Sequence, residues 1–158
     1  PVGFKYIGPI MMRENALIAG EESGGYAFRG HIPERDGVLS ALYFLDMLVK
    51  LRMSPSEVLR YLYSKVGESH FNRIDIPFSP ERREETTRRV AQAAPKALAG
   101  IPVTRVDTTD GFRFLLADTS WVLIRFSGTE PLLRIYGESD SNDRVDRLLK
   151  AARGLTGL

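Results

Sequence analysis

The sequence has 158 residues, of which 43% are hydrophobic and 27% charged, the composition of ordinary globular material in one or two domains. A formal net charge of only +2 offers no basic stripe for nucleic acid, and the lack of cysteine excludes disulfides and thiolate metal sites. The apolar runs fall short of the roughly 20 residues that span a bilayer, so we expect no membrane partner. A cytoplasmic location fits this composition.

The first 20 residues predict a loop followed by a strand. Gly3 and Gly8 mark tight bends, and residues 16–19 form a short apolar run typical of a buried strand. Lys5 stands between two aromatic residues, where it is either a surface lysine or an anion contact.

The next segment, residues 20–37, is loop-like and rich in functional groups. It opens with Gly-Glu-Glu-Ser-Gly-Gly, and carboxylates and hydroxyls on a bending backbone suit the hydroxyl groups of a sugar. The alternative is a solvated acidic turn. His31 lies in the same segment, and a hydrogen-bonded structural histidine is the alternative to a catalytic one.

Two helices should follow this segment. Asp36 is a good N-cap for a helix over 38–49 that is apolar nearly all round, so we expect structure outside this chain, or another copy, to cover it. Ser54-Pro55-Ser56-Glu57 is a strong start for the second helix, and Gly67 ends it. We place a domain boundary here, between residues 1–67 and 68–158.

The second half predicts an α+β arrangement. An alternating run over 71–77 indicates a strand, Ser79-Pro80-Glu81 starts a helix, and Pro95 kinks or ends it. Further strands and a hairpin turn at Asp110-Gly111 precede a last helix after Asp140. The expected fold is a partial α/β domain followed by a small β-α-β-β-β-α domain, with an antiparallel sheet and helices on one face. Three or four strands are expected in this run, with candidate ranges 102–106, 112–117, 121–126 and 132–137.

The loop Arg125-Phe126-Ser127-Gly128-Thr129-Glu130-Pro131 joins the last two of these strands. A guanidinium matches phosphate oxygens in pairs, Ser127 and Thr129 add hydroxyl donors, and Gly128 permits a sharp backbone bend. This combination suits a phosphate dianion. The alternative is an ordinary turn with a solvated arginine.

Together, the Glu-Glu-Ser-Gly-Gly loop at residues 21–25 and the Arg125–Pro131 loop resemble two loops of the α-D-phosphohexomutases, the phosphoglucomutase/phosphomannomutase superfamily. The resemblance covers essentially the whole chain. It implies that residues 1–67 are the C-terminal part of a sugar-binding third domain and that residues 68–158 are a phosphate-binding fourth domain. It also implies a sugar-phosphate substrate, a phosphoserine donor and a bisphosphorylated intermediate.

By this resemblance, Glu21 and Ser23 would hold sugar hydroxyls, Arg35 would contact the substrate, and Arg125, Ser127, Gly128 and Thr129 would hold the non-reacting phosphate. Arg35 stands where phosphoglucomutases of the vertebrate type have a lysine, and arginine cannot act as a base. Lys5 and His31 are therefore the acid/base candidates in this chain, and the role is equally open to residues outside it.

The sequence also departs from the family pattern. It holds neither a Thr-Ala-Ser-His-type phosphoserine segment nor an Asp-x-Asp-x-Asp metal run. We therefore expect the Mg²⁺ and the glucose 1,6-bisphosphate of the full-length enzyme to need the N-terminal domains of the same protein, and this chain alone to be inactive. The start at Pro1, without a Met, fits a fragment.

The substrate and the functional class leave alternatives open. The first loop resembles glucose-selective members, and a phosphomannomutase or another phosphohexomutase is the alternative. A non-catalytic sugar-phosphate-binding module is a hypothesis from a different class, and a self-associating structural domain is a third.

Overall fold

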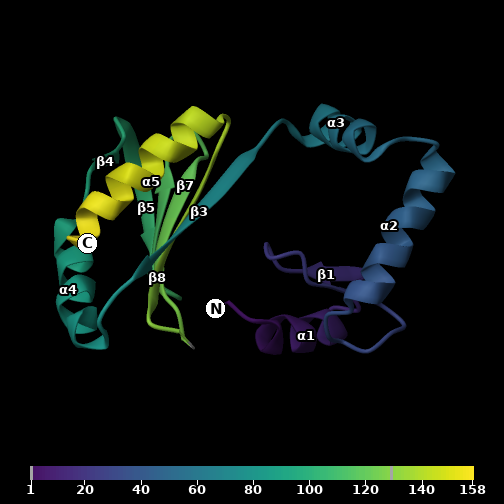
Figure 1. Cartoon of the computed structure of the whole chain (residues 1–158), viewed down its shortest axis with the longest axis horizontal. Coiled ribbons are helices and arrows are strands. Elements are labelled where there is room, and N and C mark those ends of the chain that lie inside the picture. Colours follow the sequence, from purple (N-terminus) through teal and green to yellow (C-terminus); the bar gives the residue numbers. More distant parts are fainter. Residues whose placement is uncertain (1, 129) are drawn as a thin grey trace. The chain divides into compact units, whose positions relative to one another are not determined.

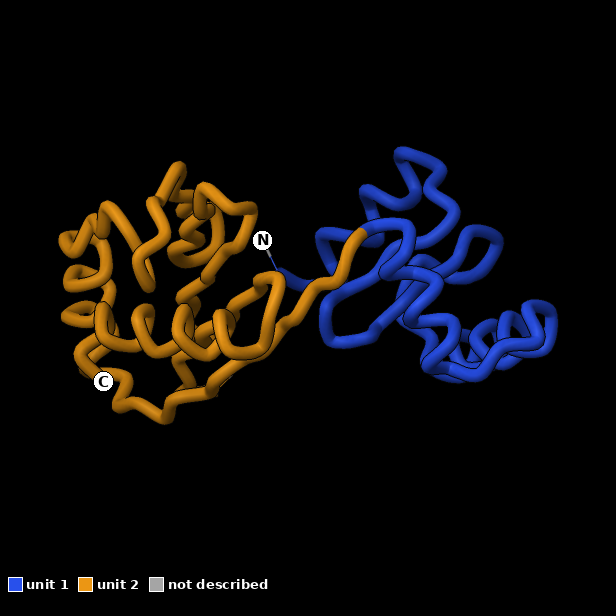
Figure 2. Tube along the Cα trace, turned by 90° about the horizontal axis from the view of Figure 1, so that it is seen from above, with its two compact units in different colours: residues 1–66 blue, residues 67–158 orange. Residues whose placement is uncertain are grey.

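A computed structural model describes residues 2–128 and 130–158 of the chain. It divides into two compact units, Pro1–Val66 and Gly67–Leu158, which are coloured blue and orange in Figure 2. Among the described residues, no helix has both the length and the apolar character required to cross a membrane.

The first unit combines helices with a small hairpin (Figure 1). Its strands β1 and β2 pair in antiparallel register, with Ala19 opposite Ala27, and α1 packs against β1. Buried side chains of Phe4, Met11 and Ala27 form the core of this unit. The elements are α1 (Phe4–Arg13), β1 (Ile18–Gly20), β2 (Tyr26–Phe28), α2 (Gly37–Leu51) and α3 (Pro55–Val66).

The predicted N-terminal loop is wrong, because residues 4–13 form α1. Gly8 is a packing residue and not a bend: a Cβ atom there would lie 2.6 Å from the carbonyl oxygen of Pro33. Phe4, Gly8 and Met11 recur at helical spacing and are all buried. Tertiary packing of this stripe outweighs the local preference of Gly8 and Pro9 against a helix.

The short strand near residue 18 exists, but its prediction as a buried strand over 16–19 is wrong. β1 covers Ile18–Gly20, and the side chains of Leu17 and Ile18 are 68% and 54% exposed. A two-stranded hairpin has little material to cover both of its faces. The loop expected over 20–37 also contains β2, which pairs with β1.

Both predicted helix starts after the hairpin are confirmed. The Asp36 carboxylate accepts a hydrogen bond from the Leu39 N–H at 2.9 Å, and the Glu57 carboxylate accepts one from the Ser54 N–H at 2.7 Å. The helix α2 is apolar nearly all round, as expected, yet none of its described residues is buried.

Among residues 67–128 and 130–158, the strands form one antiparallel sheet in the order β3-β8-β7-β6-β5-β4 (Figure 1). The predicted fold class is confirmed: a partial α/β unit precedes an antiparallel sheet with helices on one face. The short strand β4 had no sequence signal, and α4 ends before Pro95. The elements are β3 (His70–Pro77), η1 (Pro80–Arg82), α4 (Arg83–Ala93), β4 (Ala97–Leu98), β5 (Ile101–Asp107), β6 (Phe112–Leu116), β7 (Trp121–Phe126), β8 (Leu132–Ser139) and α5 (Asn142–Thr156).

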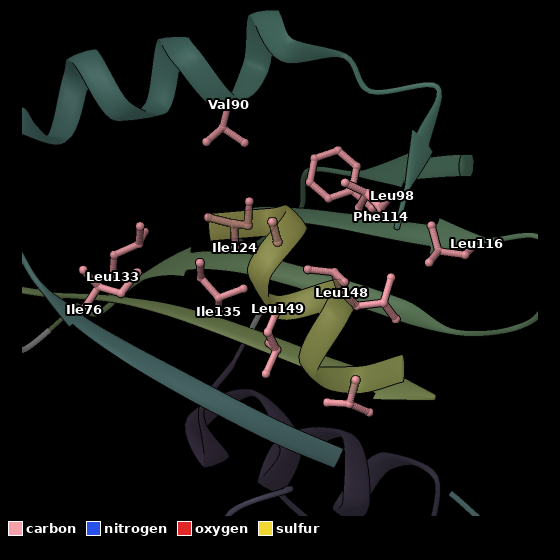
Figure 3. Close-up of a cluster of buried hydrophobic side chains, with 13 residues drawn as sticks. Ile76, Val90, Leu98, Phe114, Leu116, Ile124, Leu133, Ile135, Leu148 and Leu149 are labelled. Atoms are coloured by element: carbon pink, nitrogen blue, oxygen red, sulfur yellow. The ribbon is translucent and has the colours of Figure 1, made fainter. Parts of the chain in front are cut away.

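The core of the second unit lies between this sheet and its two helices, as Figure 3 shows. Val90 of α4 and Leu148 of α5 meet Phe114, Ile124 and other residues of the sheet. Alternate residues of β7 and β8 therefore face the helices, and the residues between them face the opposite side. Arg125 and Arg134 belong to that opposite face.

Candidate functional site

The turn between β1 and β2 carries the first group of predicted site residues. The Glu21 N–H donates to the Gly25 carbonyl and the Gly24 N–H donates to the Glu21 carbonyl, both at 3.0 Å. Gly24 has a φ of 87°, which favours glycine. The Ser23 side chain is exposed at the tip of this turn.

Glu21 and Arg35 come together although they are 14 residues apart. A guanidinium nitrogen of Arg35 lies 3.2 Å from a carboxylate oxygen of Glu21, whose side chain is only 8% exposed. The stem of Arg35 crosses Gly25, and its guanidinium lies 5.8 Å from the centre of the Phe4 ring. Helix α1 thus supports the turn through Phe4. Arg35 also contacts the carboxylate of Glu34, and its backbone N–H lowers the pKa of that carboxyl.

The two acid/base candidates have different surroundings. The His31 Nε2 atom lies 2.9 Å from a carboxylate oxygen of Asp36, and the other oxygen of Asp36 accepts the Leu39 N–H at the start of α2. These contacts, the backbone N–H foremost, lower the pKa of Asp36. Lys5 is an exposed residue of α1, with its ammonium 5.0 Å from the Tyr6 ring centre. His31 is thus tied to a helix cap, and Lys5 extends along a helix surface.

The second group lies where β7 ends. The Arg125 Nε atom donates to an Asp110 carboxylate oxygen at 3.1 Å, and the Arg125 side chain is 14% exposed. Asp110 reaches it from the hairpin turn between β5 and β6. That turn passes so close that a Cβ atom on Gly111 would overlap the Ile124 carbonyl oxygen. The predicted Asp-Gly turn therefore also orients the predicted phosphate-binding arginine.

A second arginine, which sequence reasoning missed, lies beside the first. Arg134 of β8 is directly opposite Arg125 of β7 in the sheet register. Its guanidinium contacts the carboxylate of Glu130, and its Nε atom lies 3.7 Å from an Asp75 oxygen. Among the described residues, no group accepts a hydrogen bond from this buried Nε atom. The signal was available: once the loop joins two paired strands, residues equally far from the turn face each other.

The loop between Arg125 and Arg134 is held by its own hydrogen bonds. The buried Ser127 hydroxyl accepts the Glu130 N–H at 3.2 Å, and the Ser127 N–H donates to the Leu132 carbonyl at 2.8 Å. Gly128 is exposed, has open space where a Cβ would stand, and does not adopt a positive φ. The backbone bends at Gly128, as predicted, but in a conformation that other residues can also adopt. Thr129 lies outside the described residues.

The described residues do not fit a metal ion of the kind that the resemblance implies. Residues 2–128 and 130–158 hold no group of three His, Asp or Glu side chains arranged for metal binding. The carboxylates near the arginines are engaged as ion-pair partners instead.

Comparisons with known proteins show which protein family the two units are similar to. Residues 1–66 match the family model for the phosphoglucomutase/phosphomannomutase alpha/beta/alpha domain III, and residues 82–155 match the model for the C-terminal domain of the same family. A phosphoglucomutase/phosphomannomutase of Thermococcus kodakarensis is 30% identical over 94% of this chain, and a phosphoglucosamine mutase of Methanocaldococcus jannaschii is 32% identical over 94%. The chain spans 30% and 31% of their respective lengths.

A solved structure has the same fold. The crystal structure from Thermus thermophilus that is named as a putative phosphomannomutase superposes with a TM-score of 0.77 and 32% identity. It covers 100% of this chain, which corresponds to 30% of the solved chain.

Proposed function

Because the chain belongs to the phosphoglucomutase/phosphomannomutase family, we propose that it is the substrate-binding C-terminal portion of a hexose-phosphate mutase. The whole enzyme would interconvert hexose 1-phosphate and hexose 6-phosphate through a phosphoserine and a bisphosphorylated intermediate. We assign sugar binding to the first unit and phosphate binding to the second. Glucose phosphate is the substrate we favour, with mannose or glucosamine phosphate as alternatives.

The observation that carries this proposal is the pair of arginines at the loop of the second unit. Arg125 and Arg134 lie opposite each other on neighbouring strands, and carboxylates of Asp110 and Glu130 contact them in this structure. A phosphate dianion would accept charge-assisted hydrogen bonds from both guanidiniums. The N–H group at Nε of Arg134 donates no hydrogen bond to any described residue. We therefore propose Arg134 as a phosphate contact in addition to Arg125, Ser127, Gly128 and Thr129.

The first unit supports the sugar-binding part of the proposal. Glu21 is largely buried and oriented by Arg35, so its carboxylate has a defined direction from which to accept sugar hydroxyls. Ser23 at the exposed tip offers a hydroxyl nearby in sequence. Arg35 would contact the substrate from the same turn. Such preoriented contacts position the reacting end of the sugar, an entropic contribution to catalysis.

Phosphoryl transfer would depend on residues outside this chain. In the whole enzyme, Mg²⁺ would assist transfer from the phosphoserine, and the described residues offer no place to hold it. Of the acid/base candidates here, His31 is already engaged in its contact with Asp36. Lys5 has no such carboxylate partner among the described residues and stays the simpler candidate. We expect no mutase turnover from the 158-residue chain alone.

The experiment that tests the phosphate site is calorimetric titration of this chain with inorganic phosphate and with glucose 6-phosphate. Arg125→Ala should weaken phosphate binding by about 1.5–3 kcal/mol, the worth of a hydrogen bond to a charged group. Arg88→Ala is the matched control, because Arg88 is an exposed arginine on α4. Equal phosphate affinity in wild type and Arg125→Ala would refute the site.

A non-catalytic sugar-phosphate-binding module is the second candidate function. A fusion of this chain to the missing domains distinguishes it from the mutase. We expect mutase turnover when this chain is fused to the N-terminal domains of a family member, and none from the chain by itself. A joined protein that binds glucose 6-phosphate without any turnover would favour the binding module.

A further inference from the structure

Glu130 belongs to the loop that is proposed to bind phosphate, yet its carboxylate is engaged with one of the two arginines. It contacts the terminal guanidinium nitrogen of Arg134, four residues along the chain. Its backbone N–H donates to the Ser127 hydroxyl at 3.2 Å. The side chain of Glu130 is 52% exposed, whereas that of Arg134 is 21% exposed. The exposed carboxylate of Glu130 thus contacts the more buried guanidinium of Arg134.

The other carboxylates near the arginine pair are held by separate partners. Asp110 is bonded to Arg125 from the β5–β6 turn, at 3.1 Å. Asp75 lies 2.9 Å from the Arg73 guanidinium on its own strand, and its distance to the Arg134 Nε atom is longer, at 3.7 Å. Glu130 is therefore the closest anionic partner of Arg134. It is also the one carboxylate of the three that lies in the loop and not on a paired strand or hairpin turn.

A carboxylate and a phosphate oxygen present the same chemistry to a guanidinium, so both compete for the same donors. Phosphate that contacts Arg134 must displace Glu130 or share the guanidinium with it, and two anions at one guanidinium repel each other. The exposed Glu130 side chain can turn outward to water at little cost. The affinity of the site for phosphate would therefore depend on Glu130 as well as on the two arginines.

We propose that Glu130 is an affinity-setting residue, an internal anion that occupies Arg134 in the absence of substrate and lowers the affinity of the site for phosphate. This inference rests on the proposed function, since it treats Arg134 as part of the phosphate site. In a mutase the sugar phosphate must leave or turn round after each transfer, and a built-in competitor favours that release.

The test is calorimetric titration of the 158-residue chain with inorganic phosphate, for wild type, Glu130→Gln and Arg125→Ala. Glu130→Gln keeps the side-chain shape and removes the charge. We expect it to raise phosphate affinity about two- to fivefold, the range that the loss of one exposed ion pair allows. Glu84→Gln, an equal charge change at an exposed position of α4, is the matched control and should change affinity far less.

The possible outcomes separate the two proposals. Wild type that binds phosphate, with Arg125→Ala weaker and Glu130→Gln unchanged or weaker, overturns the role of Glu130 and keeps the phosphate site. Arg125→Ala that binds as well as wild type overturns the site itself. A gain in Glu130→Gln that Glu84→Gln reproduces in full would be an effect of net charge, and this also overturns the role of Glu130. Thermal unfolding of each variant verifies that it is folded.

Discussion

Gly25 and Arg35 are in direct contact: a Cβ atom on Gly25 would overlap the Cδ atom of Arg35. The absence of a side chain at Gly25 is therefore what lets the arginine cross the turn and reach Glu21 at 3.2 Å. The small residue Gly25 of the turn between β1 and β2 thus decides where a charged residue ten positions later lies.

Gly25→Ala should move Arg35 away from Glu21. Because the Arg35 side chain is half exposed and its stem can rotate, we expect a loss of less than about 1 kcal/mol in the free energy of unfolding. The affinity for glucose 6-phosphate should fall, since both residues are proposed substrate contacts. Titration with glucose 6-phosphate measures the effect, and unchanged affinity would show that the position of Arg35 plays no part. Gly24→Ala is the contrasting variant: Gly24 has a φ of 87° and open space around it, so its cost should be backbone strain.

Gly111→Ala should destabilise the second unit. Gly111 has a φ of 99°, and a Cβ atom there would overlap the Ile124 carbonyl oxygen, which belongs to a rigid strand. Backbone strain alone costs about 1–3 kcal/mol, and the clash adds to it. The turn that carries Asp110 to Arg125 would shift as well. Chemical denaturation measures the loss of stability, and wild-type stability in this variant would contradict the packing described here.

Gly128→Ala should behave in the opposite way. The site of its Cβ is open, so we expect the free energy of unfolding to change by less than about 0.5 kcal/mol. Phosphate affinity should fall, because a methyl group on the loop would block an anion from approaching the loop backbone. Denaturation together with phosphate titration separates the two effects. Unchanged phosphate affinity would place the anion away from Gly128.

The pKa of Asp36 should lie below its ordinary value of 3.8. The Leu39 N–H, and to a lesser extent His31, stabilise the charged carboxylate by hydrogen bonds. The folded-state pKa is lowered, so the stabilising contribution of this carboxylate is present above pH 3.8 and is lost as the pH falls through the folded-state pKa. An NMR titration of the Asp36 carboxyl gives the midpoint. His31→Gln should raise that midpoint only in part, since the helix N-terminus makes the larger contribution. A midpoint at or above 3.8 in wild type would contradict the cap.

The exposed stripe of α2 should make the isolated chain self-associate. Val38, Leu42, Leu45 and Val49 recur on one side of the helix and are 58–76% exposed. We expect the double variant Leu42→Gln, Leu45→Gln to lower the apparent mass in light scattering while its thermal midpoint stays near that of wild type. A variant that unfolds would instead mean that these leucines are covered within the chain. A wild-type chain that is monomeric at every concentration would contradict the expectation.

Some features of this protein follow from the sequence by itself. The caps at Asp36 and at Ser54-Glu57, the Asp110-Gly111 turn and the strands on either side of the Arg125 loop depend on neighbouring residues, so local chemistry predicts them. The two family loops carried enough pattern to indicate a sugar-phosphate site, whose individual contacts stay predictions.

Other features depend on tertiary structure, because contacts between distant residues decide them. Helix α1 forms where Gly8 and Pro9 favour a loop, since its buried stripe packs against β1 and the loop at Pro33. The pairing of Arg134 with Arg125 follows from strand register, and the engagement of Arg134 by Glu130 follows from how the loop folds back. Composition and spacing identify which charged residues are present. Register and packing decide which of them face one another, and so what the loop can bind.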